Sequence, residues 1–111
     1  NMNNLENTVE LITKQTLTTM NTTYTINKKF SDYKLIVLIY AVVNGNIVSI
    51  RGTEMIPTAI FSLGTVGGLL HAVGGTPTAI NAYEFLYVSD TSYKAYTGNS
   101  AFNTLYIYGV K

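Results

Sequence analysis

The sequence predicts an all-β domain: an antiparallel, jelly-roll-like β-sandwich of about seven to eight strands with a short helical stalk at its N-terminus. Apolar residues alternate with polar ones at a period of two, and turn residues recur about every ten residues. No segment after Gln15 has a helical period. Short strands with this spacing are typical of sandwiches and jelly rolls. The 111 residues allow one such domain.

The first fifteen residues carry a different pattern. Apolar side chains are spaced by three, four and three residues, at Met2, Leu5, Val9 and Ile12. This is the a/d rhythm of a coiled coil, although a helix this short is marginal in water on its own. We interpret residues 1–15 as the end of a coiled-coil stalk or neck and residues 16–111 as the head domain. The alternative is an amphipathic helix that packs on its own domain.

The first two predicted strands differ in their patterning. Residues 20–30 alternate between a largely apolar and a wholly polar face, as expected of a strand with one face in water. Ser31 and Asp32 then make a turn. Tyr33–Val43 is apolar at almost every position and rich in β-branched residues, which predicts a strand covered on both faces. The second cover would come from a second sheet or from a neighbouring subunit.

Turn signals divide the rest of the chain. Asn44-Gly45 is a strong hairpin signal because both residues tolerate positive φ. We expect the returning strand at 47–51, a break at 52–54 and a further strand at 56–63. Glycine-rich turns at 64–68 and 74–77 flank a short strand. The later strands are expected at 69–73, 79–89, 92–97 and 103–110.

Composition excludes several classes of function. The chain has no Cys and one His, so a Cys-based or multi-His metal site is ruled out, and we expect no cofactor. A net charge of +1 argues against nucleic-acid binding, and the longest apolar run is about half a membrane span. Charged residues make up only 12%, roughly half the usual share. A small domain with so few charges suits burial against copies of itself, so we expect a homo-oligomer.

No catalytic motif stands out, and we expect a protein that is not an enzyme. His71 lies in an apolar strand without a nucleophile-elbow sequence nearby, which favours a structural role. Glu54 and Glu84 are the candidates for a glycosidase pair, but nothing in the sequence places them face to face.

The best candidate for a binding site is the short strand near residue 95 and the turns that flank it. Tyrosine offers a large rigid surface and a hydroxyl group at low entropic cost, and amides and carboxylates bond to sugar hydroxyls. The candidate ligand-binding residues are Asp90, Tyr93, Lys94, Tyr96 and Asn99. The alternative is an ordinary amphipathic hairpin with no ligand.

Three stretches of the chain carry a resemblance. They are the Thr-rich TLTTMNTTYTI, then FSDYKLIVLIY, and the C-terminal LYIYGVK. An S-D-Y strand near the start and an I-x-G-V-K ending resemble the C-terminal receptor-binding tip domains of bacteriophage tail-fibre and baseplate proteins. The matching residues are Ser31, Asp32, Tyr33, Leu35 and Ile36, then Ile107, Gly109, Val110 and Lys111. The resemblance covers about residues 16–111.

This resemblance implies a homotrimeric, jelly-roll-like head at the tail tip of a virion. Such heads attach the virion, outside the cell, to saccharides or proteins of the host surface, and commonly need no cofactor. The alternative is a structural trimerisation or capping domain that ends a fibre without touching a receptor. A tail depolymerase would be a third class, but it needs the carboxylate pair or triad that the sequence lacks.

Overall fold

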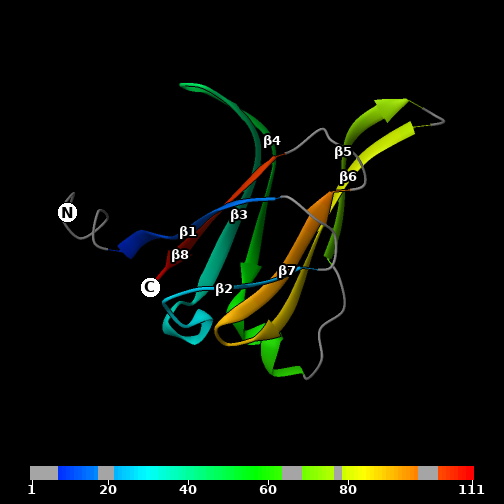
Figure 1. The fold of residues 1–111 in the computed structure, drawn as a ribbon. Helices are drawn as coiled ribbons and strands as arrows, with labels where there is room; N and C mark the ends of the chain where they lie inside the picture. The colour runs from blue at the N-terminus through cyan, green and yellow to red at the C-terminus, as the bar shows by residue number, and fades with distance from the viewer. Residues whose placement is uncertain (1–7, 18–21, 64–68, 77–78, 98–102) are drawn as a thin grey trace.

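The computed structural model describes residues 8–17, 22–63, 69–76, 79–97 and 103–111. Over these residues the chain forms two four-stranded antiparallel sheets that lie face to face (Figure 1). Sheet A has the order β1 (Val9–Thr16), β8 (Thr104–Val110), β3 (Leu35–Asn44) and β4 (Ile47–Pro57). Sheet B has the order β2 (Thr23–Thr25), β7 (Ser92–Thr97), β6 (Ala79–Ser89) and β5 (Leu69–Thr76). The predicted all-β sandwich is confirmed.

The connections combine crossings with hairpins. The first strand, β1, pairs with the last, β8, and the second, β2, pairs with the second to last, β7. β3 and β4 remain neighbours in sheet A, and β5, β6 and β7 remain neighbours in sheet B. Short connections account for these pairings, because two strands joined by a tight turn form an antiparallel hairpin.

The core lies between the sheets and is lined by the inner-facing residues of each strand. On β3 the inner residues Ile36, Leu38 and Tyr40 are fully buried, as are Leu105 and Ile107 on β8. Sheet B contributes Phe85, Tyr93 and Ala95, also fully buried. Burying one large apolar side chain stabilises the fold by about 2 kcal/mol.

The prediction of a helical stalk is wrong for residues 9–15, and residues 1–7 lie outside the described residues. Val9–Thr16 is a strand that pairs with β8 from Val9 opposite Val110 to Thr16 opposite Thr104. β8 already pairs with β3 on one side, so its other edge offers free backbone groups, and the β-branched residues of this segment suit a strand. Ile12 is buried on the inner face, as its three-residue spacing from the exposed Val9 requires in a strand, and a β-bulge there shifts the register between Leu11 and Thr13.

The bounds of several other elements also differ from the predicted ones. β2 is only three residues long, and the turn predicted at Ser31 and Asp32 is a 3₁₀ turn, η1, that begins one residue earlier at Phe30. The hairpin loop is Gly45 and Asn46, since Asn44 pairs with Ile47, and Gly45 has a φ of 61°. A bulge at residue 51 replaces the expected break, so β4 is continuous. Pro57 ends β4, and Thr58–Leu63 form a second 3₁₀ segment, η2, where a strand was predicted.

Strand β3 has its predicted position but is not covered equally on its two faces. Sheet B covers the inner face, while the outer residues Leu35, Val37 and Ile39 remain partly exposed. None of the described helical segments has the length and apolarity that a bilayer span requires.

Candidate functional site

The segments η1 and η2 and the β6–β7 turn meet at one end of the sandwich (Figure 1). A hollow lies between side chains of these segments. Its volume is about 280 Å³. Three aliphatic hydroxyl groups, one carboxylate, a phenyl ring and a phenol ring line it, from Ser31, Thr58, Phe61, Ser62, Tyr87 and Asp90. Asp90 is the one predicted ligand-binding residue among them.

Asp90 is held in place by the turn of η1. The Ser31 backbone N–H donates to Oδ1 of Asp90 at 2.9 Å, and the Ser31 hydroxyl donates to Oδ2 at 2.6 Å. The backbone carbonyl of Asp90 accepts from the Phe30 N–H at 2.9 Å. A carboxylate has about four acceptor positions, so each oxygen keeps capacity for a ligand donor. The carboxylate is thus both oriented by the fold and available to the hollow.

The hydroxyl groups of η2 form the facing wall. The Thr58 hydroxyl donates to the backbone carbonyl of Tyr33 at 2.5 Å, and the Thr58 N–H donates to that of Lys34 at 3.0 Å. These bonds attach η2 to the segment that follows η1. The Ser62 hydroxyl donates to the carbonyl of Ala59 at 2.8 Å, and the residue is exposed at the rim. Each hydroxyl still has lone pairs that can accept from a ligand.

Aromatic rings form the apolar wall of the hollow. Phe61 and Tyr87 stack with centroids 4.2 Å apart and an angle of 8° between the ring planes. Behind them Phe30 contacts both rings, at 5.8 and 6.0 Å, and continues into the core through Phe85. Such packing holds the rings of the wall in fixed positions.

The predicted binding patch is not one surface. Tyr93 is fully buried, with its ring packed on Phe85 and Tyr24, so its prediction as an exposed ligand contact is wrong. Lys94 is partly exposed and pairs with Thr23 across β2 and β7. The backbone of Tyr96 pairs with that of Glu84, and Asn99 lies outside the described residues. Because neighbouring residues of a strand face opposite ways, Tyr93 and Lys94 could not share a surface.

No pattern in the sequence indicated the other residues of the hollow. Ser31 was assigned to a turn, and Thr58, Phe61 and Ser62 were placed in a strand. Only the position of Pro57 signalled that a strand would end there. Tyr87 lies on β6, which was predicted as a strand, and packs against the core.

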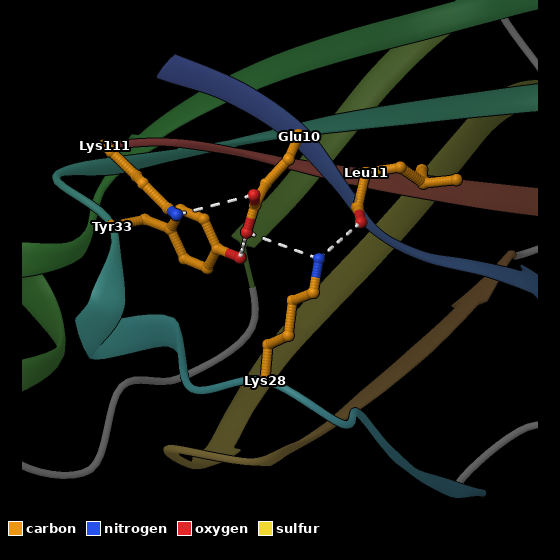
Figure 2. Close-up of polar contacts among 5 residues, drawn as sticks. All are labelled: Glu10, Leu11, Lys28, Tyr33 and Lys111. Atoms are coloured by element: carbon orange, nitrogen blue, oxygen red, sulfur yellow. Dashed lines mark hydrogen bonds and ion pairs between the residues drawn. The ribbon is translucent and has the colours of Figure 1, made fainter. Parts of the chain in front are cut away.

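A second polar cluster joins the two ends of the described chain (Figure 2). The Tyr33 hydroxyl donates a short hydrogen bond to Glu10, and Nζ of Lys28 and Lys111 lie 3.3 and 3.5 Å from the Glu10 carboxylate. Lys28 also donates to the carbonyl of Leu11 at 3.2 Å. The hydrogen bond from Tyr33 lowers the pKa of Glu10, with a smaller contribution from the two lysines. Burial and the carboxylate raise the pKa of Tyr33 well above its ordinary value.

Tyr33 also brings together the two motifs that carry the resemblance. A Cβ built on Gly109 would lie 2.3 Å from the Tyr33 ring, so only glycine allows the ring to pack on β8. The Lys34 N–H donates to the carbonyl of Val110 at 2.7 Å. The S-D-Y and G-V-K residues therefore form one structural contact. We interpret the Glu10 cluster as a clamp for β1 and not as a ligand site.

The groups that line the hollow are hydroxyl groups, one carboxylate and aromatic rings. Its described lining holds one carboxylate, without a second acid, a histidine or a lysine beside it. Nor do the described residues gather three or more potential metal ligands at any point. Glu54 lies on β4 of sheet A and Glu84 on β6 of sheet B. Comparison of the chain with protein-family models, with curated proteins and with solved structures found no match.

Proposed function

We propose that this domain is a non-enzymatic binding head that attaches a phage tail fibre or baseplate to a saccharide of the host cell surface. The hollow beside Asp90 carries the proposal. It combines a fixed carboxylate with three aliphatic hydroxyl groups and two stacked rings at one end of a rigid sandwich. Binding residues on short segments that a rigid scaffold positions are typical of recognition sites.

The chemistry of the hollow suits a sugar. A monosaccharide presents hydroxyl groups that both donate and accept, and C–H faces that pack on aromatic rings. Asp90 accepts from sugar hydroxyls, Thr58 and Ser62 can accept from them as well, and Tyr87 offers a ring face. A carboxylate acceptor gives a hydrogen bond about twice as strong as a neutral one. A volume of about 280 Å³ is near the lower end of small-molecule sites, which suits one or two sugar units.

The proposal includes assembly and location. The short S-D-Y and G-V-K motifs support a jelly-roll-like head at the tail tip of a virion, and such heads are homotrimers. Several weak sites on one oligomer raise avidity by about 10²–10⁴ without any new contact. A shallow, solvent-facing hollow is therefore sufficient for attachment when it is repeated on each copy.

A structural trimerisation or capping domain is the second candidate. The partly exposed apolar face of sheet A favours it, because assembly alone would use that face and leave the hollow empty. The two candidates make opposite predictions for ligand binding. A capping domain would bind neither cells nor glycans.

Blocking the hollow tests the proposal. Ser62→Trp places a large ring at the exposed rim and should reduce binding to a glycan array and to host cells by at least about tenfold. Ser62→Ala and Thr23→Trp are the controls, one removing only a rim hydroxyl and the other placing the same ring on exposed β2. Both should bind nearly as the parent chain does.

Three results would count against the site or the ligand. Equal binding by Ser62→Trp would remove the hollow as the site. Binding that survives periodate oxidation of the cells but is lost after protease treatment would identify a protein receptor instead. A folded parent chain that binds no glycan and no cell would favour the capping domain.

A further inference from the structure

The outer face of sheet A is an apolar surface that spans all four strands. The register places one outward residue of each strand in a transverse row, formed by Leu11, Tyr108, Val37 and Met55. The next row consists of Val9, Val110, Leu35 and Pro57. Side chains on the opposite face of the same strands, such as Ile36 and Ile107, form the core. The sheet is thus apolar on both faces, but only one face is covered by sheet B.

The exposure of these residues is unusual for their type. Met55 is 65% exposed, and Val9 and Leu11 at the β1 edge are 47% and 43% exposed. Val48 and Ile50 extend the apolar surface along β4, where they are 48% and 60% exposed. Single exposed apolar residues are common, but a contiguous set marks an interaction surface.

We propose that this face binds the same face of a second copy of the chain. Charge argues for a copy of itself as the partner. A symmetric contact places a surface against its own equivalent, so any charge at its centre would meet a like charge. The two rows above carry none, and the third row, Lys14, Tyr106, Ile39 and Thr53, carries one at the β1 edge. The Lys14 ammonium already lies 5.7 Å from the centre of the Tyr106 ring.

The net charge supports the same partner. At +1 per chain, two copies repel each other only weakly, and repulsion would not prevent close approach. A chain with 12% charged residues also lacks the charged surface that normally keeps a small domain monomeric.

In projection, the face has about half of the area that a stable interface buries per partner. Four strands about 4.8 Å apart, each with about seven residues rising 3.3 Å apiece, give a face of roughly 440 Å² in projection. The accessible surface of protruding side chains is larger than this projection, and Val48 and Ile50 add to it. A stable interface buries about 800 Å² per partner, and the largest apolar patch of a monomer is about 300–600 Å². Face-to-face packing of sheets at about 10 Å would complete the contact.

Solution mass tests the contact. The full chain should run at a multiple of 12.2 kDa in light scattering, twofold for a face-to-face pair and threefold for three faces around an axis. Met55→Glu puts a charge in the central row and should reduce the mass to that of one chain. Leu63→Glu, at a residue 84% exposed on η2, is the matched control and should keep the parent mass.

A cysteine probe provides a second measurement, because the chain contains no cysteine of its own. In Met55→Cys, thiol labelling should be slowed at least about tenfold at high protein concentration and recover on dilution. Labelling of Leu63→Cys should not depend on concentration. Circular dichroism on each variant confirms that the sandwich is folded.

A parent chain that stays at 12.2 kDa at all concentrations would overturn the proposal, as would an oligomer that persists in folded Met55→Glu. The contact does not depend on what the hollow binds. Met55→Glu changes assembly and leaves Ser62 intact, whereas Ser62→Trp changes the hollow and leaves the face intact. Each proposal can therefore fail separately.

Discussion

At the scale of single residues, two buried hydroxyl groups stand out. Tyr24 and Tyr93 face each other across β2 and β7 with ring centroids 5.5 Å apart. Among the described residues, neither hydroxyl has a hydrogen-bond partner. Burial, with a smaller contribution from Tyr24, raises the pKa of Tyr93 above its ordinary value. A buried polar group without a hydrogen-bond partner costs about 1–3 kcal/mol, so these hydroxyl groups lower the stability of the folded state.

We therefore expect Tyr93→Phe to stabilise the protein by about 1 kcal/mol, because the ring remains and the unpaired hydroxyl is removed. Tyr40→Phe is the matched control. The Tyr40 hydroxyl donates to the backbone carbonyl of Glu84 at 3.0 Å, so its loss should cost about 1 kcal/mol. Urea denaturation measures both changes. A destabilised Tyr93→Phe would mean that the hydroxyl has a partner, such as a buried water.

At the scale of elements, side-chain contacts of Glu10 help to hold β1 in place. This strand lies at the edge of sheet A, and Glu10 connects it to Lys28, Tyr33 and Lys111 (Figure 2). The pKa of Glu10 is lower in the folded chain than in the unfolded chain. The folded state therefore gains stability from the ionised carboxylate above the ordinary pKa of 4.5 and loses it as the pH falls through the lower folded pKa.

Glu10→Gln should remove this pH dependence. We expect the variant to have a lower melting temperature than the parent at pH 7, and the difference to shrink as the pH falls below about 4.5. Thermal unfolding followed by circular dichroism between pH 7 and 2.5 measures it. Tyr33→Phe lacks the hydrogen bond to Glu10, so the loss of stability in acid should begin at a higher pH. Parallel pH profiles for parent and Glu10→Gln would contradict the assignment.

At the scale of the whole molecule, the N-terminal strand is part of the sandwich and not an attachment to it. β1 and β8 pair along seven register positions, and Ile12 adds to the core between the sheets. Backbone hydrogen bonds extend the pairing at each end, from Leu17 to Asn103 and from Lys111 to Thr8. A strand removed from this place would leave β8 as an unpaired edge beside the core.

Deletion of residues 1–14 should therefore destabilise the head strongly instead of merely shortening a stalk. We expect loss of cooperative unfolding or aggregation, since the deletion removes most of β1, Ile12 and the Glu10 clamp. Size-exclusion chromatography and thermal unfolding measure the effect. Adding a peptide of residues 8–17 in trans should partly restore the fold. A truncated chain as stable as the parent would show that β1 contributes little.

Elements that depend on the pattern of neighbouring residues were predicted correctly, whereas those that depend on contacts with distant segments were not. The bounds of β6 and β7 agree with the predicted 79–89 and 92–97, because alternation and turn residues are local properties. β1 was mistaken for a helix because its pairing partner, β8, lies about ninety residues later in the chain. Asp90 was predicted as part of a patch around Tyr93, and its place in the hollow, like that of Phe61 and Ser62, depends on how η2 folds against η1.

The sequence by itself determined the fold class, the two-sided apolar character of β3 and the low charge that favours self-association. These follow from residue type and period, which act within a few neighbours. Only the tertiary structure decided that β1 is a strand, that Tyr93 is buried and that Asp90 shares a hollow with η2. Those outcomes depend on contacts between distant segments, such as that of Ser31 with Asp90. The pattern of neighbouring residues does not reveal such contacts.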